Sequence, residues 1–164
     1  MVWMLSGCTV QRSIVDDVDT DFYSRVYFTP GPECENNIIA HINSAETMRI
    51  AVYSITDPGI GVAIIAAYKR GADIRIISDR VQAKNRASLI DAFRAVGIPV
   101  ALNRGYKIEH NKFAVFDNKT VLTGSYNWTT NASEYNSENC MFSNTNANEY
   151  NTRFNELWDK YVTR

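Results

Sequence analysis

Four side chains that could act together on a phosphate group lie close together in this sequence. His110 and Lys112 are two residues apart, and Ser125 and Asn127 repeat that spacing. Side chains two apart on an extended strand point to the same face, so each pair is predicted to share one. The set contains an imidazole, an ammonium, a hydroxyl and a carboxamide. A tetrahedral, anionic group such as a phosphodiester needs a nucleophile or acid, a fixed positive charge and neutral donors, which this set supplies.

The first part of the chain alternates between expected strands and helices. Runs rich in strand-forming residues predict strands over 26–28, 48–54, 73–78 and 99–102. Apolar residues at helical spacing predict helices over 33–44, between Pro58 and Gly71, and over 86–96. Such alternation predicts parallel strands joined by crossover helices that pack on the sheet.

After Asn103 the rhythm changes to strand, turn, strand. The run 108–117 is expected to be a strand, and its part 112–117 is expected to form a hairpin with 120–123 around a tight turn at Asn118-Lys119. A helical turn over 128–132, a strand over 138–143 and a helix over 147–161 are expected to follow. Residues 22–164 are therefore expected to form one domain of the α/β class. Its sheet is predicted to be mixed, largely parallel and flanked by helices on both faces.

The aromatic residues divide into an expected core set and two candidates for substrate contact. The core set occupies strand or helix positions and comprises Tyr27, Phe28, Phe113, Phe116 and Trp158. Tyr106 and Trp128 flank the residues that could do chemistry, so they are the two candidates.

Composition limits the classes of partner. The chain has 164 residues, 45% hydrophobic and 21% charged, which is typical of a soluble globular protein. Its net charge is −1, so polyanion binding would require a local basic patch. Candidate basic residues precede the motif: Arg80, Lys84, Arg86, Arg104 and Lys107. They would contact phosphates, although a solvated surface is an equal alternative, and no element that would read bases is visible.

The first 21 residues are expected to be a truncated leader or a flexible tether. Leu5-Ser6-Gly7-Cys8 resembles a bacterial lipobox, whose cysteine would be acylated and would anchor the protein in the periplasm or cell envelope. The apolar stretch before it is shorter than a complete signal sequence. The alternative to an exported protein is therefore a cytoplasmic one whose N-terminus is frayed.

Three cysteines without a Cys-x-x-Cys pair, together with only two histidines, argue against a structural zinc site. If the protein is exported, Cys34 and Cys140 could form a disulfide while Cys8 is lipidated. If it is cytosolic, all three are expected to be thiols.

The four polar residues belong to a longer sequence pattern. His-x-Lys, four residues, Asp117, six residues and Gly-Ser-x-Asn resembles the HKD motif of the phospholipase D superfamily. Three further segments, Tyr53-Ser54-Ile55-Thr56, Lys69-Arg70-Gly71-Ala72-Asp73 and Ser137-Glu138-Asn139, are similar to the small bacterial Nuc-type endonucleases of that superfamily. The resemblance covers about Val26 to Tyr161 and implies a phospholipase D-like α/β/α sandwich.

The resemblance also implies roles for the motif residues. His110 would attack phosphorus and form a covalent phosphohistidine, with no metal or cofactor. Lys112 and Asn127 would hold the non-bridging phosphate oxygens, assisted by Ser125. Glu138 would bond the other imidazole nitrogen and fix its tautomer.

Asp117 completes the motif but lies five residues from Lys112, so strand parity turns it away from the phosphate. We expect it to brace the hairpin.

A second histidine is needed in this family to protonate the leaving oxygen, and the motif occurs once. The other histidine, His41, is followed by Asn43 and not by a lysine, and lies on a predicted helix. We therefore predict a symmetric homodimer in which two copies of His110 face each other.

The leading hypothesis is a metal-independent, sequence-nonspecific endonuclease acting on DNA or RNA. The first alternative is a phospholipase D or phosphatidyl transferase that acts on lipid phosphodiesters. A third class is a nucleic-acid-binding module that retains the fold without catalysis.

Overall fold

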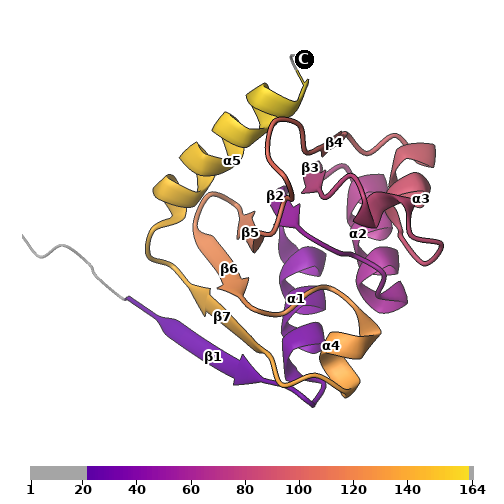
Figure 1. Ribbon diagram of the computed structural model, residues 1–164. Coiled ribbons are helices and arrows are strands. Elements are labelled where there is room, and N and C mark those ends of the chain that lie inside the picture. Colours follow the sequence, from indigo (N-terminus) through magenta and orange to yellow (C-terminus); the bar gives the residue numbers. More distant parts are fainter. Residues whose placement is uncertain (1–21, 163–164) are drawn as a thin grey trace, which may run out of the picture.

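A seven-stranded β-sheet lies between two layers of helices in the computed structural model, which describes residues 22–162 (Figure 1). The strands are β1 (Ser24–Phe28), β2 (Thr47–Val52), β3 (Asp73–Ser78), β4 (Val100–Leu102), β5 (Lys112–Phe116), β6 (Thr120–Gly124) and β7 (Asn139–Ser143). The helices are α1 (Glu33–Ser44), α2 (Pro58–Arg70), α3 (Ile90–Ala95), α4 (Thr130–Glu134) and α5 (Ala147–Val162), with a 3₁₀ turn η1 (Gln82–Lys84).

The order of strands across the sheet is β1-β7-β6-β5-β2-β3-β4. The pairings β2 with β3 and β3 with β4 are parallel, whereas the four others are antiparallel. The predicted mixed sheet with helices on both faces is confirmed, but the description "largely parallel" is wrong. The reason is that β1 does not join β2: it lies at the far edge against β7, and the hairpin β5–β6 fills the space between.

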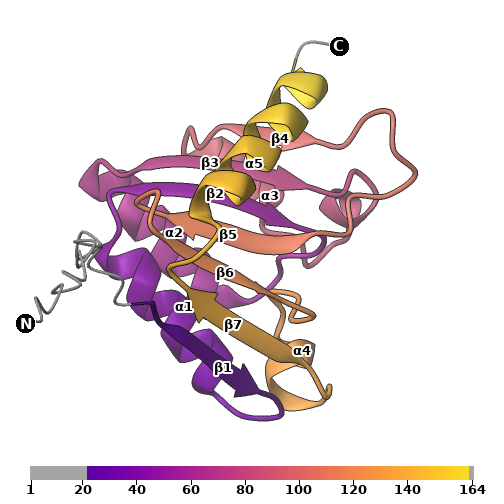
Figure 2. The same ribbon diagram turned by 90° about the vertical axis from the view of Figure 1, so that its left-hand side faces the viewer.

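Alternating side chains of β5 supply both halves of the core. Ala114 and Phe116 face the cluster formed with α1 and α2, while Phe113 and Val115 face the cluster under α5. Figure 2 shows α5 crossing one face of the sheet, with α1 and α2 behind the opposite face. Burial of each large apolar side chain stabilises the fold by about 1.5–3 kcal/mol, so the two clusters fix the sheet that carries the motif.

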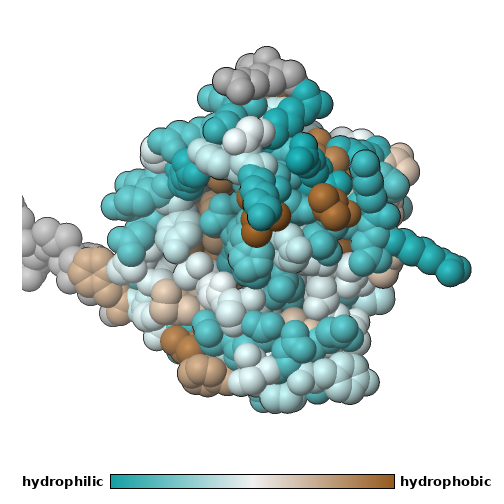
Figure 3. Space-filling model, in the orientation of Figure 1, coloured by the Kyte–Doolittle hydropathy of each residue, from teal (hydrophilic) through white to brown (hydrophobic). Residues whose placement is uncertain are grey.

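The first edge strand corrects one prediction about the core. Phe28 was expected to be buried but is 68% exposed, and Val26 on the same face of β1 is 47% exposed. Figure 3 shows hydrophobic colour along β1 on an otherwise mainly hydrophilic face. We call Val26 and Phe28 the β1 patch. It is open because α5 lies over the other end of the sheet (Figure 2).

Two expected elements begin later than their sequence patterns indicated. The strand predicted from residue 108 begins at Lys112, because Glu109 uses its backbone N–H on the Asp79 carboxylate and not in a strand pairing. The helix predicted from residue 86 begins at Ile90, because residues 85–88 form a hydrogen-bonded turn instead.

A disulfide joins Cys34 at the start of α1 to Cys140 in β7, with their Cα atoms 5.9 Å apart. This is the pairing expected for an exported protein. The leader or tether over residues 1–21, with Cys8, lies outside the described residues. Within residues 22–162, no helix is both long enough and apolar enough to cross a membrane.

Candidate active site

All the motif residues except Asp117 lie at one edge of the sheet. The strands β2, β3 and β4 run in parallel, and β6 runs the same way because it pairs antiparallel with β5, which pairs antiparallel with β2. Their carboxyl ends therefore share an edge with the first residues of β5 and β7. That edge is where open α/β sheets bind their ligands.

His110 lies in the extended segment just before β5, with its ring exposed. Its ring centroid is 4.8 Å from that of Tyr53, at an interplanar angle of 62°. The backbone is fixed one residue later, where the Asn111 carbonyl accepts the Tyr53 N–H at 2.8 Å. Within residues 22–162, neither imidazole nitrogen of His110 has a hydrogen-bond partner, so both are available to a substrate or a second chain.

Lys112 is the first residue of β5 and is half-buried beside His110. Its Nζ donates to the His110 carbonyl at 2.8 Å and lies 5.1 Å from the Tyr53 ring centroid. Burial lowers the pKa of Lys112, while the carboxylates of Glu138 and Glu109 act in the opposite direction. The ammonium is thus held at the site edge by the His110 carbonyl and the Tyr53 ring, and two nearby carboxylates favour its charged form.

The turn after β6 presents Ser125, and only glycine fits at its first position. Gly124 has φ +151°, and a Cβ there would lie 2.2 Å from the Asn139 carbonyl oxygen. The Ser125 hydroxyl accepts the Asn139 N–H at 3.1 Å and retains its own proton for donation.

Asn127 is held in place from both sides by buried aromatic neighbours. The Tyr126 hydroxyl lies 2.6 Å from Ser133 Oγ, and burial raises the pKa of Tyr126 to about 12. Trp128, one of the two candidates for substrate contact, is buried and pairs with Ile55, so it belongs to the core. Asn127 Oδ1 is itself buried without a hydrogen-bond partner in the described part of the chain. Buried amide oxygens are rarely left unpaired, and exceptions gather at functional sites.

Glu138 stands immediately before β7, next to the site. Its Oε1 accepts from Asn136 Nδ2 at 3.1 Å, and its backbone N–H donates to Thr29 Oγ1 at 3.0 Å. Within one chain its carboxylate has no hydrogen bond to His110 among residues 22–162. Its predicted role toward an imidazole remains a prediction.

Asp117 lies at the opposite end of β5 from Lys112. Its Oδ1 accepts the backbone N–H groups of Glu46 and Thr47, each at 2.8 Å. This side chain fixes the β5–β6 turn to the start of β2 and lies away from the site edge.

The five predicted basic residues are all exposed, on the segments that leave the sheet at the site edge. They are Arg80 after β3, Lys84 and Arg86 in and after η1, and Arg104 and Lys107 after β4. Arg80 and Arg104 flank the buried Asn103, whose Oδ1 accepts the Arg80 backbone N–H at 2.7 Å.

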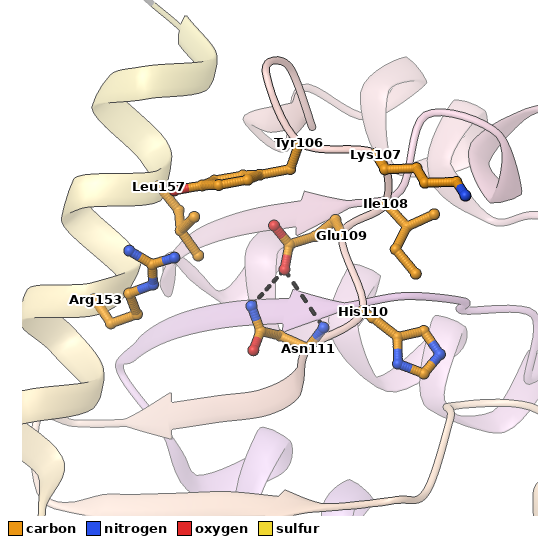
Figure 4. Close-up of a pocket in the computed structure, with 8 residues that line it drawn as sticks. All are labelled: Tyr106, Lys107, Ile108, Glu109, His110, Asn111, Arg153 and Leu157. Atoms are coloured by element: carbon orange, nitrogen blue, oxygen red, sulfur yellow. Dashed lines mark hydrogen bonds between the residues drawn. The ribbon is translucent and has the colours of Figure 1, made fainter.

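A cavity of about 410 Å³ opens between the motif segment and α5 (Figure 4). It is lined by Tyr106, Lys107, Ile108, Glu109, His110, Asn111, Arg153 and Leu157. Tyr106, the other candidate for substrate contact, extends across its top in Figure 4. Arg153 and Lys160 beside its hydroxyl lower the pKa of Tyr106.

Arg153 is a cation that lines the same cavity as His110 and contacts Tyr106, and the sequence analysis missed it. It lies on α5 next to the buried Phe154, and its guanidinium also bonds Glu156 at 3.0 Å. Nothing in its local pattern marks it, because the contact exists only once α5 packs against residues 106–111. Glu109, a buried acid next to His110 in the chain, was missed for the same reason.

These features define an α/β protein with a histidine and a lysine at the carboxyl edge of its sheet. Residues 38–158 match the family model described as "Cardiolipin synthase, PLD-like domain". The chain therefore belongs to the phospholipase D superfamily.

Solved structures with the same fold agree with the Nuc-type resemblance. Nuc from Salmonella typhimurium, a phospholipase D family member, is 31% identical, with a TM-score of 0.80 over 85% of this chain and 96% of that one. NucT from Helicobacter pylori is 28% identical, with a TM-score of 0.79 over 85% of this chain and 98% of NucT.

Curated relatives carry lipid-related names. A mitochondrial cardiolipin hydrolase of Chlamydomonas reinhardtii is 34% identical over 133 residues, which cover 79% of this chain and 60% of that protein. A phospholipase D of Rickettsia prowazekii is 35% identical over 115 residues, 70% of this chain and 56% of that protein. The chain thus spans little more than half the length of the curated relatives that it matches.

Proposed function

We propose that this chain is a phosphodiesterase that cleaves DNA or RNA internally without sequence specificity. The observation that carries the proposal is the convergence of His110, Lys112 and Asn127 at one sheet edge, surrounded by exposed basic residues. The likeness to Nuc and NucT, which covers almost the whole of both chains, supports it. Phosphate contacts from the basic residues would supply affinity without reading bases.

The reaction follows from the chemistry of these side chains. A neutral imidazole nitrogen of His110 attacks phosphorus, and a nitrogen–phosphorus bond forms as the bond to the leaving oxygen breaks. A protonated second imidazole gives its proton to that oxygen. Water then attacks the phosphohistidine, loses a proton to the second imidazole and regenerates His110. Lys112 and the Asn127 amide stabilise the negative charge on the non-bridging oxygens, so the chain's own residues can carry the reaction without a metal.

The second imidazole is proposed to come from a second copy of the chain. His41 contacts Phe116. Phe116 follows His110 by six residues of extended chain, so it lies about 20 Å from His110. Its Nδ1 also bonds the Asn37 carbonyl at 2.8 Å. A two-fold axis at the site edge would instead bring the partner's His110 into place.

The exposed β1 patch is consistent with such a partner. Phe28 pairs with Asn139, so it lies beside Glu138 at the border of the site. Exposed apolar side chains that border a functional site are common at protein–protein interfaces.

The second candidate function is phospholipase D or phosphatidyl transferase activity on lipid phosphodiesters. The names of the curated relatives favour it, and the same site could hold a lipid headgroup phosphate. The third alternative is a non-catalytic nucleic-acid-binding module. It does not explain why His110 and Lys112 lie together at the site edge.

We also propose that the protein is exported to the periplasm or cell envelope and anchored there through Cys8. The disulfide between Cys34 and Cys140 supports it, because disulfides persist in oxidising compartments.

The test compares wild type with His110→Ala on plasmid DNA, single-stranded oligonucleotides and phosphatidyl lipids, all in EDTA. We expect cleavage of nucleic acid by wild type and none by the variant. Hydrolysis of lipid alone would favour the second function, and binding of nucleic acid without cleavage would favour the third.

A mixed dimer tests the origin of the second imidazole. One wild-type chain and one His110→Ala chain, carrying different affinity tags, are co-expressed and purified as a heterodimer. Because each site needs both copies of His110, the heterodimer should be almost inactive. A heterodimer with half of the wild-type activity would show that each chain works alone.

A further inference from the structure

A buried carboxylate lies directly beside the catalytic histidine in the chain. Glu109 is 2% exposed, and its oxygens accept hydrogen bonds from two different elements. Oε1 accepts from the Asn111 side-chain amide and, at 3.4 Å, from the Asn111 N–H (Figure 4). Oε2 accepts from the hydroxyl of Tyr161 on α5. The Glu109 N–H donates to Asp79 Oδ2 at 3.1 Å, which ties the same residue to the end of β3.

We propose that Glu109 is a positioning residue that orients the His110–Lys112 segment and places a carboxylate near the Lys112 ammonium. This inference rests on the proposed function for its kinetic test, and a second test below is independent of it.

The cost of burial argues for a role beyond packing. An ionised carboxylate removed from water is destabilising unless its oxygens are well bonded, and an apolar side chain of similar size avoids that cost. In the described part of the chain, no lysine or arginine forms an ion pair with Glu109. Its donors are neutral, so its negative charge is not cancelled by a direct partner and acts on its surroundings.

The negative charge of Glu109 acts on the Lys112 ammonium, which is the cation of the site. Around Lys112 stand the Tyr53 ring at the end of β2, the His110 carbonyl, Glu138 before β7 and Glu109 itself. Burial lowers the pKa of Lys112, and the carboxylates of Glu138 and Glu109 oppose that effect. Removing the charge of Glu109 should therefore lower the pKa of Lys112 further.

Groups from several elements face Glu109. The Tyr161 hydroxyl comes from α5, Asp79 lies after β3, and Tyr106 and Arg153 line the same cavity. Burial and the hydrogen bond to Glu109 raise the pKa of Tyr161, so this hydroxyl stays a neutral donor over the range in which an enzyme is assayed.

The kinetic test uses Glu109→Gln, Tyr161→Phe and the double variant, with Asp91→Asn on the exposed face of α3 as control. We expect Glu109→Gln to lower kcat about tenfold to hundredfold, as for other residues that orient catalytic groups, with KM changed less than twofold. The alkaline limb of its pH–kcat profile should move to lower pH, because a neutral Lys112 cannot hold the phosphate. Tyr161→Phe should lower kcat less, and the double variant should lose less than the product of the two single losses.

The second test titrates Lys112 directly in the ¹³C-labelled protein by NMR, with no substrate. A lower Lys112 pKa in Glu109→Gln than in wild type supports the proposal even if nucleic acid is not the substrate. An unchanged Lys112 pKa together with a wild-type pH profile would overturn it. So would a loss of activity explained entirely by a smaller folded fraction, measured by circular dichroism.

Discussion

The two histidines of this chain differ in almost every physical respect. His41 on α1 is half-buried, its ring centroid lies 4.5 Å from that of Phe142, and its Nδ1 bonds the Asn37 carbonyl. His110 is exposed at the site edge, and both of its nitrogens lack protein partners within residues 22–162. The Nδ1 atom and the ring of His41 both contribute to the fold, whereas the ring of His110 contacts Tyr53 but neither of its nitrogens is bonded among residues 22–162. The environment, more than the residue type, separates an imidazole that serves the fold from one that is accessible for chemistry.

Matched substitutions of His110 and His41 are the strongest test of this comparison. His110→Asn should lower kcat by at least about a thousandfold, because it removes the group that we propose forms the covalent bond. His41→Asn should leave the specific activity of the folded protein within about twofold of wild type. Both are measured by phosphodiester cleavage at equal folded concentrations. Equal losses in the two variants would contradict the assignment.

The next effect concerns the groups around His110. Asn127→Ala should lower kcat by about a hundredfold to a thousandfold, the range found when one donor to a developing oxyanion is removed. Asn139, whose N–H bonds the Ser125 hydroxyl, gives the control. Because its side chain is only weakly bonded there, at 3.4 Å, Asn139→Ala should cost much less. A rate loss of the same size in both variants would show that the turn, and not the Asn127 amide, is what matters.

Arg153 extends the comparison from the two histidines to a cation in the cavity that His110 lines. Arg153→Gln should raise KM for nucleic acid several-fold and reduce the slope of log KM against log salt by a little less than one, since one phosphate contact is lost. Arg94→Gln, an exposed arginine on α3 paired with Asp91, is the matched control and should change neither quantity. Identical salt slopes for wild type and Arg153→Gln would place the substrate elsewhere.

The sequence was most informative where function depends on residues that are close along the chain. The spacing of His110, Lys112, Ser125 and Asn127 could be recognised because one hairpin carries all four. The position of β1 could not, because its pairing with β7 joins residues more than a hundred positions apart. Glu109 and Arg153 were missed for the same physical reason. Their roles depend on how α5 packs against the motif segment, as in the bond from Tyr161 to Glu109 across 52 positions.

The smallest effect is expected at His41, where only stability should change. His41→Phe keeps a ring against Phe116 and Phe142 but removes the hydrogen bond to the Asn37 carbonyl. The free energy of unfolding should fall by about 1 kcal/mol, the usual net value of one such bond. Urea denaturation followed by circular dichroism measures it. His41→Ala, which also loses both ring contacts, should cost more, and each variant should retain full activity per folded molecule. A stable His41→Phe protein with no activity would instead make His41 a part of the reaction, and the case for a partner's His110 would then fail.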